Sequence, residues 1–470
     1  MFREEKSTAS STRHRHPLAA LRAKAGYTHS EYARLIAATH AELGFGHMAA
    51  RREKVSRWEA GRAVPERTAQ LAIAHIHAVP EEEVSRLDWP DWLHLAHGDA
   101  RQLELPWTTS AVPEAILDAV AARQQTQQGY LLATGWAAKS LAENWLDAMT
   151  EELAKSPAGL SHSTPAGPWE PGPEVEPGSV LQACTRLRTL HMFAGKFTAG
   201  WLVPASEQEL RHLADHFVAV PDVLNNGQGL LTLAAEGLAL CGFIARLQGE
   251  HVSAQRYYVA GLRCATAAAD AETAAAIVTL HAAQYLDLHL HDEATELLTS
   301  ARTLLSRRRV RVKDPALTAL IHAQTARVHA QRGDDLGRKR ALLEGRLALS
   351  TEPHASRMPI LPIRCDSWLQ LMDGVTLLEL GQPDRALKCF EPVLSEQVPQ
   401  LRLPPCVRAL YLLRAAETQV ALGDAAAGAE AVAEAATLLG GVRAAASERV
   451  RLALRAYSHL PEVRQLLSSE

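Results

Sequence analysis

A short segment near the N-terminus combines side chains that can read duplex DNA with apolar side chains that can anchor a helix. It runs Lys54-Val55-Ser56-Arg57-Trp58-Glu59-Ala60-Gly61-Arg62. An arginine can pair with both acceptors on a guanine edge, and a glutamate can accept from the amino group of cytosine. Val55 and Trp58 are spaced to pack on one face of a helix, and Gly61 is suited to end it. The segment therefore predicts a helix that lies between a small core and a polyanion.

The charge distribution favours the same interpretation. Between Arg13 and Arg62 there are ten basic and four acidic residues, a net charge of +6, whereas the whole chain carries −4. By difference, the rest of the chain carries −10. A small basic module on a larger acidic body is the layout expected when one end of a protein meets nucleic acid.

The elements around this segment must hold it in place, and helix start and stop residues define them. Pro17 suits the first turn of a helix, and Thr28 with Glu31 forms a capping box at the start of the next. The pattern predicts helices over residues 17–25, from 29 to the glycines near 44, over 51–60, and between 65 and 80.

Composition bounds the fold class and the chemistry of the remaining chain. Ala and Leu dominate, aromatic residues are only 5%, and 470 residues are too many for one ordinary core. We therefore expect an all-α protein with two or more domains. The six cysteines are widely spaced without a CxxC pair, which disfavours disulfides and a zinc site. We expect no metal, no cofactor and no catalytic constellation.

The N-terminus lacks the apolar core of a signal peptide. No stretch reads as long and apolar enough to span a bilayer, so we expect no membrane partner and a cytoplasmic location. Pro, Gly and Ser are concentrated in residues 156–179, which is typical of a linker or loop. The expected organisation is a disordered tail at 1–15, a DNA-binding domain at 16–80, a helical connector at 81–155, the linker at 156–179, and a helical repeat domain at 180–470.

The region after residue 180 shows an internal period. Short turn segments recur between pairs of apolar stretches, near residues 249, 291, 333, 381 and 423, with spacings close to 42 residues and one of about 48. Repeated helical hairpins bury their apolar faces on each other and form a solenoid. The pattern resembles tetratricopeptide-type repeats, with a period longer than their usual ~34 residues. A generic Ala-rich helical bundle is the alternative.

The N-terminal residues resemble a known DNA-binding family, the Cro/repressor-type helix-turn-helix or XRE family. The resemblance rests on Leu18-x-x-Leu21-Arg22, Gly26-Tyr27-Thr28-x-x-Glu31-x-Ala33, and Val55-Ser56-Arg57-Trp58-Glu59-x-Gly61-Arg62-x-x-Pro65. It covers about 65 residues. It implies a helix-turn-helix fold whose recognition helix is Arg51–Ala60.

The resemblance also implies roles for single residues. Arg52, Glu53 and Arg57 fall where the family contacts bases, and His29, Ser30, Lys54 and Arg62 fall where it contacts phosphates. The predicted DNA-binding set is His29, Ser30, Arg51, Arg52, Glu53, Lys54, Ser56, Arg57 and Arg62. Arg22 and Glu59 fall where the family forms a buried ion pair between its first helix and the end of the recognition helix.

One departure concerns the turn before the recognition helix. About eleven extra residues, roughly His40–Ala50, stand where the family has a tight turn. They predict either a longer second helix followed by a loop, or a wing beside the DNA groove. Because of this departure, the sequence does not define where the recognition helix starts, and the roles of Arg51 and Arg52 depend on that start.

The combination of an N-terminal helix-turn-helix with a long repeat region resembles actinobacterial regulators of differentiation and secondary metabolism. It implies a transcriptional regulator that binds double-stranded DNA as a homodimer on two half-sites. The repeat domain is expected to dimerise and to receive a peptide, small-molecule or protein effector. A scaffold or adaptor acting through protein–protein contacts is the alternative, and no enzyme is expected.

Overall fold

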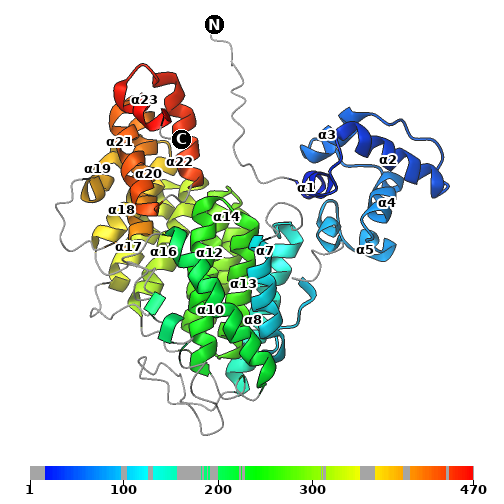
Figure 1. Ribbon diagram of the computed structural model, residues 1–470, viewed down its shortest axis with the longest axis horizontal. Coiled ribbons are helices and arrows are strands. Elements are labelled where there is room, and N and C mark those ends of the chain that lie inside the picture. Colours follow the sequence, from blue (N-terminus) through cyan, green and yellow to red (C-terminus); the bar gives the residue numbers. More distant parts are fainter. Residues whose placement is uncertain are drawn as a thin grey trace. The chain divides into compact units, whose positions relative to one another are not determined.

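The computed structural model describes residues 16–96, 103–124, 131–155, 199–221, 228–307, 314–349, 366–394, 403–440 and 444–468, with a few single positions between them (Figure 1). All regular structure in these residues is helical and none of them lies in a strand, which confirms the all-α fold class. The predicted tail at 1–15 and the predicted linker at 156–179 lie outside the described residues.

The chain divides into two compact units. Among the described residues, the N-terminal unit extends to Pro106 and includes Ala121–Asn144, and the large unit comprises Trp107–Val120 and the chain from Trp145 onward. The N-terminal unit therefore includes more of the chain than the expected DNA-binding domain at 16–80. The chain enters the large unit at Trp107, returns to the N-terminal unit at Ala121, and leaves it again after Asn144.

Over residues 16–96, the N-terminal unit forms five α-helices and a short 3₁₀ helix. They are α1 (Pro17–Lys24), α2 (His29–Glu42), α3 (Arg52–Glu59), α4 (Arg67–Ile76), α5 (Glu81–Arg86) and η1 (Asp91–Leu95). The predicted capping box starts α2: Thr28 Oγ1 accepts from the Glu31 amide at 3.2 Å, and Glu31 Oε2 accepts from the Thr28 amide at 2.8 Å. One apolar core joins these elements and continues past residue 80 through Val84, Trp92 and Leu131.

The extra residues before α3 form a longer second helix followed by a loop. Helix α2 runs to Glu42, and Gly44 and Gly46 take positive φ angles of 78° and 84°, which favour glycine. His40 Nδ1 lies 2.9 Å from the carbonyl oxygen of Gly46, and the His40 ring contacts Phe45 edge to face. The backbone from Phe45 to Arg51 is irregular.

The large unit is a succession of helices. They are η2 (Thr109–Ala111), α7 (Val112–Gln124), α8 (Gly135–Lys155), α10 (Ala199–Ala219), α12 (Gln228–Gln248), α13 (His251–Ala267), α14 (Ala271–Asp287), α15 (His291–Leu305), α16 (Pro315–Gln331), α17 (Asp335–Leu349), α18 (Asp366–Glu379), α19 (Pro383–Leu394), α20 (Pro405–Ala421), α21 (Ala425–Leu439), α22 (Ala445–Leu454), η3 (Arg455–Tyr457) and α23 (Pro461–Ser468). The unit boundaries fall inside α7 and α8.

The recurring turn segments join pairs of helices that pack closely on each other. These hairpins are α12–α13, α14–α15, α16–α17, α18–α19 and α20–α21. Each turn contains one residue with positive φ, a glycine in four turns and His289 in the second. A left-handed residue is the usual way to end a helix before a sharp reversal, so the periodic signal in the sequence marks the hairpin turns.

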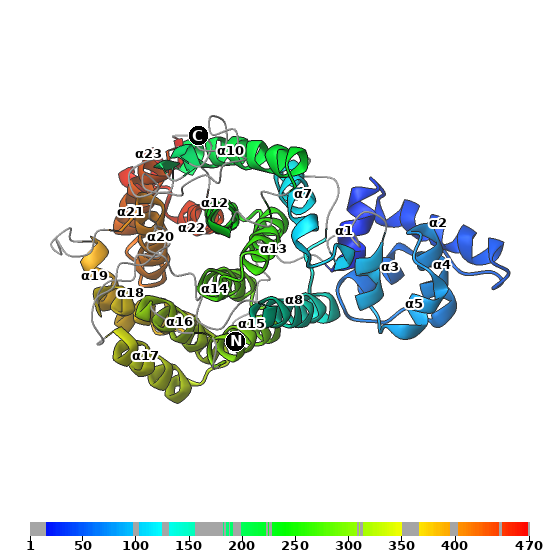
Figure 2. The same cartoon turned by 90° about the horizontal axis from the view of Figure 1, so that it is seen from below.

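In four of the hairpins, one helix lies on the outer side of the large unit and the other lies inside it. Figure 2 shows α15, α17, α19 and α21 along the outer side of the large unit, with α14, α16, α18 and α20 inside them. Helix α22 contacts α12, although the two are far apart in the sequence. A Cβ atom on Gly249, in the turn after α12, would lie 2.8 Å from Ala445 Cβ, so this close approach requires glycine.

Helix α12 is long and apolar enough to cross a membrane by length and composition, which corrects the expectation that no stretch is. Its most apolar window has a mean hydropathy of 1.7, and 89% of that window is buried inside the protein. The helix contacts α10, α13, α14 and α22. A core helix surrounded on all sides needs apolar residues around its whole circumference, and this accounts for its composition.

A chain of ion pairs crosses the inner helices. Asp287 at the end of α14 accepts from Arg246 Nε of α12 at 2.7 Å and from Arg327 Nη2 of α16 at 3.0 Å, and Arg414 Nη2 of α20 lies at 3.5 Å. Arg327 also donates to Glu379 Oε1 of α18 at 2.7 Å. We call these residues, together with Glu417 of α20 and Arg449 of α22, the inner charge chain: Arg246, Asp287, Arg327, Glu379, Arg414, Glu417 and Arg449.

In the inner charge chain, burial and the attraction between opposite charges shift the pKa values of the side chains in opposite directions. Burial raises the pKa of the Asp287 carboxyl, but three guanidinium groups outweigh it and hold that pKa well below its ordinary value. Burial lowers the pKa of Arg327, and the carboxylates of Glu379 and Asp287 outweigh it, so its pKa ends above the ordinary value. The side chain of Arg327 is only 3% exposed, so its charge depends on these partners.

Candidate nucleic-acid interface

Helix α3 presents a polar face opposite its buried face. Val55 and Trp58 are buried and fix the helix on α1 and α2. The side chains of Arg52 and Glu53 are 71% and 66% exposed, and both Ser56 and Arg57 are exposed as well. Positions 52, 53, 56 and 57 lie on one side of a helix because of its 3.6-residue turn. These four predicted DNA-binding residues therefore form one exposed polar face.

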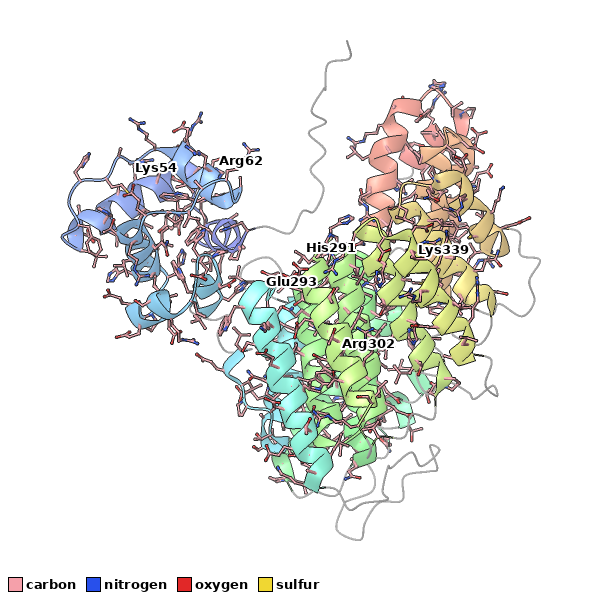
Figure 3. The ribbon with its side chains drawn as sticks, turned by 180° about the vertical axis from the view of Figure 1, so that it is seen from behind. Lys54, Arg62, His291, Glu293, Arg302 and Lys339 are labelled. Carbon is pink, nitrogen blue, oxygen red and sulfur yellow. The ribbon has the colours of Figure 1, made fainter. Side chains whose placement is uncertain are left out.

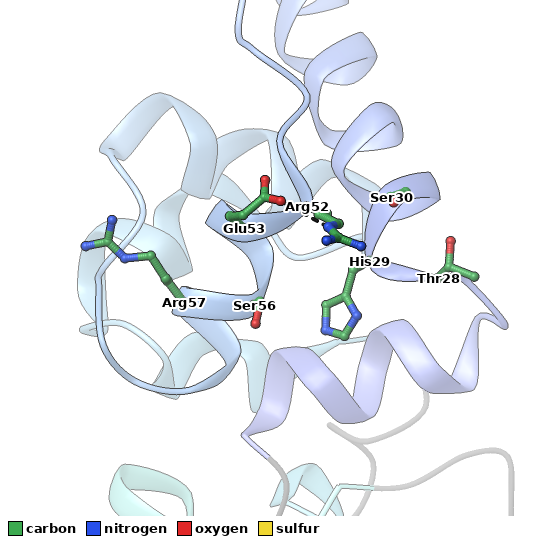
Figure 4. A pocket seen from close by; sticks show the side chains of 7 residues that line it. All are labelled: Thr28, His29, Ser30, Arg52, Glu53, Ser56 and Arg57. Atoms are coloured by element: carbon green, nitrogen blue, oxygen red, sulfur yellow. Dashed lines mark hydrogen bonds and ion pairs between the residues drawn. The ribbon is translucent and has the colours of Figure 1, made fainter.

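This polar face borders a hollow with a volume of about 570 Å³. The hollow is lined by Thr28, His29, Ser30, Arg52, Glu53, Ser56 and Arg57, which Figure 4 shows from close by. The first three residues come from the start of α2 and the other four from α3. Six of the seven belong to the set predicted from the sequence, so the fold brings the start of α2 and the polar face of α3 together.

An ion pair joins α1 to the end of α3. Arg22 Nε donates to Glu59 Oε1 at 2.5 Å, and Arg22 Nη2 donates to Glu59 Oε2 at 3.0 Å. The two side chains are 14% and 8% exposed. The hydrogen bond to Glu59 raises the pKa of the Arg22 guanidinium above its ordinary value. These are the two residues expected to pair from the sequence, and their geometry is the bidentate one that fixes orientation.

The third guanidinium nitrogen of Arg22 fixes the start of α2. Arg22 Nη1 donates to the carbonyl oxygen of Tyr27 at 2.7 Å, in the turn before Thr28. His29 Nε2 lies 2.9 Å from Glu59 Oε2, so the imidazole joins the same group of contacts. The phosphate contact expected for His29 stays a prediction, and the structure shows that the His29 imidazole contacts Glu59. One carboxylate thus connects the first three helices.

The polar face offers both donors and an acceptor. Arg52 Nε donates to Glu53 Oε1 at 3.0 Å. The Glu53 amide and then the Arg52 side chain lower the pKa of the Glu53 carboxyl, so it is ionised at neutral pH. An ionised carboxylate only accepts hydrogen bonds, whereas arginine only donates them. The face can therefore distinguish base edges that present acceptors from those that present an amino group.

Three predicted residues lie outside the hollow. Arg51 precedes α3 as its N-cap residue, Lys54 is exposed on α3, and Arg62 is exposed in the turn after it. Figure 3 shows Lys54 and Arg62 along one edge of the N-terminal unit. Flanking cations of this kind suit contacts to a phosphate backbone.

Thr28 and Tyr27 were not among the predicted site residues. Thr28 lines the hollow, and the Tyr27 carbonyl accepts from Arg22. The capping box already places Thr28 at the start of α2, so a signal for its position was present in the sequence. The contact of Arg22 with the Tyr27 backbone has no signal in residue types, because any residue has a carbonyl oxygen.

In the described residues, no three His, Cys, Asp or Glu side chains are grouped so that they could hold a metal ion. Among those residues, the cysteines Cys264, Cys389 and Cys406 are free.

Comparisons of the chain with protein-family models, with curated proteins and with solved structures found no match.

Proposed function

We propose that this protein is a sequence-specific DNA-binding regulator of transcription. In this proposal the N-terminal unit is a helix-turn-helix of the XRE type, and α3 enters the major groove of duplex DNA. The observation that carries the proposal is the exposed face of Arg52, Glu53, Ser56 and Arg57 on a helix held from behind by Val55, Trp58 and the Arg22–Glu59 pair. Direct readout needs such a face: polar, exposed and rigidly held.

The second part of the proposal concerns the large unit. We interpret its five consecutive hairpins as a tetratricopeptide-like solenoid that dimerises the protein and receives an effector, whether peptide, small molecule or protein. Two copies would place two α3 helices on half-sites about one helical turn apart, because one small module buries little DNA surface. The free cysteines and the burial of α12 are consistent with a cytoplasmic location.

Substitution of Arg57 tests DNA binding directly. Genomic fragments bound by the full-length chain are selected first, and the affinity of Arg57→Ala for the best fragment is then measured at moderate salt. We expect a loss of about 1–3 kcal/mol, roughly five- to 150-fold, together with relaxed preference at one base pair. Arg385→Ala, at an exposed arginine of α19, is the matched control and is expected to leave the affinity unchanged.

The same experiment separates the regulator from the adaptor. If the full-length chain binds no genomic fragment better than random DNA at moderate salt, the regulator proposal fails and the adaptor alternative remains. A large loss of affinity in Arg385→Ala would show that binding is a general charge effect rather than readout by α3.

A further inference from the structure

Helix α17 carries an apolar stripe on its exposed side. Leu336, Leu343 and Leu347 are 70%, 54% and 60% exposed, and their spacing of seven and four residues places them on one face. The opposite face is buried through Ala341 and Leu342, in the hairpin with α16. Single exposed leucines are ordinary, but three on one face of the same helix are typical of an interaction site.

The rim of this stripe is basic. Arg340 lies on the stripe itself, between Leu336 and Leu343, and Arg346 is exposed beside it. Lys339 is also exposed (Figure 3), but its Nζ lies 2.6 Å from Asp335 Oδ2, so the two arginines carry the charge of the rim. Glu344 is the one acidic residue among the exposed positions of α17, a helix that the structure describes from end to end. Its carboxylate lies 3.1 Å from His322 Nδ1 of α16. The stripe therefore presents leucines framed by arginines.

The charges disfavour a second copy of this chain as the occupant. In a two-fold antiparallel contact centred on Leu343, Arg340 of one copy would face Arg346 of the other, and like charges opposite each other are repulsive. Nucleic acid is disfavoured because three leucines offer it no hydrogen bonds. A stripe one helix wide is complementary in shape to another amphipathic helix laid along it.

We propose that α17 docks an amphipathic helix of another protein, with an apolar stripe that covers the leucines and acidic residues that pair with Arg340 and Arg346. Burial of the leucines supplies affinity, and the arginines select acidic over basic partners. The proposal does not depend on DNA binding, so either can fail without the other.

The test uses the full-length chain and two synthetic helical peptides. Both carry leucines along one face, and the flanking positions are glutamate in one and lysine in the other. We expect fluorescence anisotropy to show that the glutamate peptide binds at least about tenfold more tightly. The double variant Leu336→Gln/Leu343→Gln should lose about tenfold in affinity, and Arg340→Glu/Arg346→Glu should reverse the peptide preference. Leu452→Gln, at a 41% exposed leucine of α22, is the matched control.

Several outcomes would overturn the proposal. Equal binding of the two peptides, or undiminished binding by the leucine double variant, removes its basis. If the chain instead binds vesicles of anionic lipid and the leucine variant abolishes that binding, the face belongs to a membrane surface. If the leucine variant converts a dimer to a monomer in sedimentation, the face is a contact between copies. Circular dichroism verifies that every variant is folded.

Discussion

The two units of this protein stabilise charge in different ways. The N-terminal unit has one compact group, in which Glu59 contacts Arg22 and His29 at the junction of three helices. The large unit has the inner charge chain, in which residues of six helices alternate in sign and contact one another. In the N-terminal unit the charged group fixes α3, whereas in the large unit the inner charge chain links consecutive hairpins.

This difference suggests where each unit is sensitive to substitution. In the N-terminal unit, loss of one pair should affect the placement of α3 and leave the rest of the core intact. In the large unit, Asp287 has partners on three other helices and Arg327 has partners on two, so loss of either side chain should propagate to neighbouring hairpins. Consecutive hairpins of the large unit contact each other, which gives such coupling a physical basis.

The largest expected effect is that of Arg327→Met. The substitution leaves Asp287 without one partner and leaves Glu379 without the arginine that neutralises it. Removing one member of a buried ion pair costs about 3–5 kcal/mol. We expect a loss of this size in the protection of α14, α16 and α18, measured by hydrogen exchange on the full-length chain. Arg385→Met is the control. If Arg327→Met costs less than about 1 kcal/mol, the inner charge chain contributes little to the stability of the fold.

A smaller and more local effect is expected for Glu59→Gln. Arg22 and His29 would both lose their carboxylate, at a cost near the lower end for buried pairs, about 3 kcal/mol. Hydrogen exchange should rise in α1, α2 and α3 and remain unchanged in α14 to α18. Glu53→Gln, at the exposed acid of the polar face, should leave exchange unaltered. A rise in exchange that spreads through the large unit would contradict the expectation that the effect is confined to the N-terminal unit.

The smallest expected effect is a pH dependence that both units share. Burial lowers the pKa of His77, whose Nε2 lies 2.7 Å from the Tyr32 hydroxyl, to about 4. Burial likewise lowers the pKa of His281, which stacks on Tyr285, to about 3. The unfolded chain binds these protons near pH 6.5, so the stabilisation is complete above that pH and falls as the pH drops. Between pH 7 and pH 5 each histidine should cost about 2 kcal/mol.

Urea unfolding at pH 7 and pH 5 measures this effect, and NMR titration of the imidazoles measures the two pKa values. His77→Gln should reduce the acid sensitivity of the N-terminal unit by about 2 kcal/mol, and His281→Gln should reduce that of the large unit by a similar amount. An imidazole that titrates near pH 6.5 in the folded chain would refute the prediction for that residue.

Much of the local structure could be predicted from residue types. Thr28 and Glu31 specify the start of α2, and the predicted recognition helix differs from α3 by one residue at each end. Helix starts and turns can be predicted in this way because caps and turns depend on a few residues adjacent in the sequence. The same holds for the hairpin turns, although His289 takes the left-handed conformation without being glycine.

Other features could not be predicted because they depend on contacts distant in sequence. The core of the N-terminal unit includes Leu131, beyond a segment that belongs to the large unit. Arg246 and Arg414 appear in the sequence as ordinary helical arginines, yet both contact Asp287. The assignment of the N-terminal unit to the helix-turn-helix type and of the hairpins to a solenoid remains a prediction.

The sequence alone determined that the protein is helical, where its helices begin and turn, and which face of α3 is polar, because capping, glycine turns and periodicity act within a few residues. Only the tertiary structure decided that the start of α2 and the polar face of α3 share one hollow, that α12 is enclosed on all sides, and that seven charges form one chain. These features arise when segments far apart in the chain pack together, and local sequence patterns do not specify which distant segments contact each other.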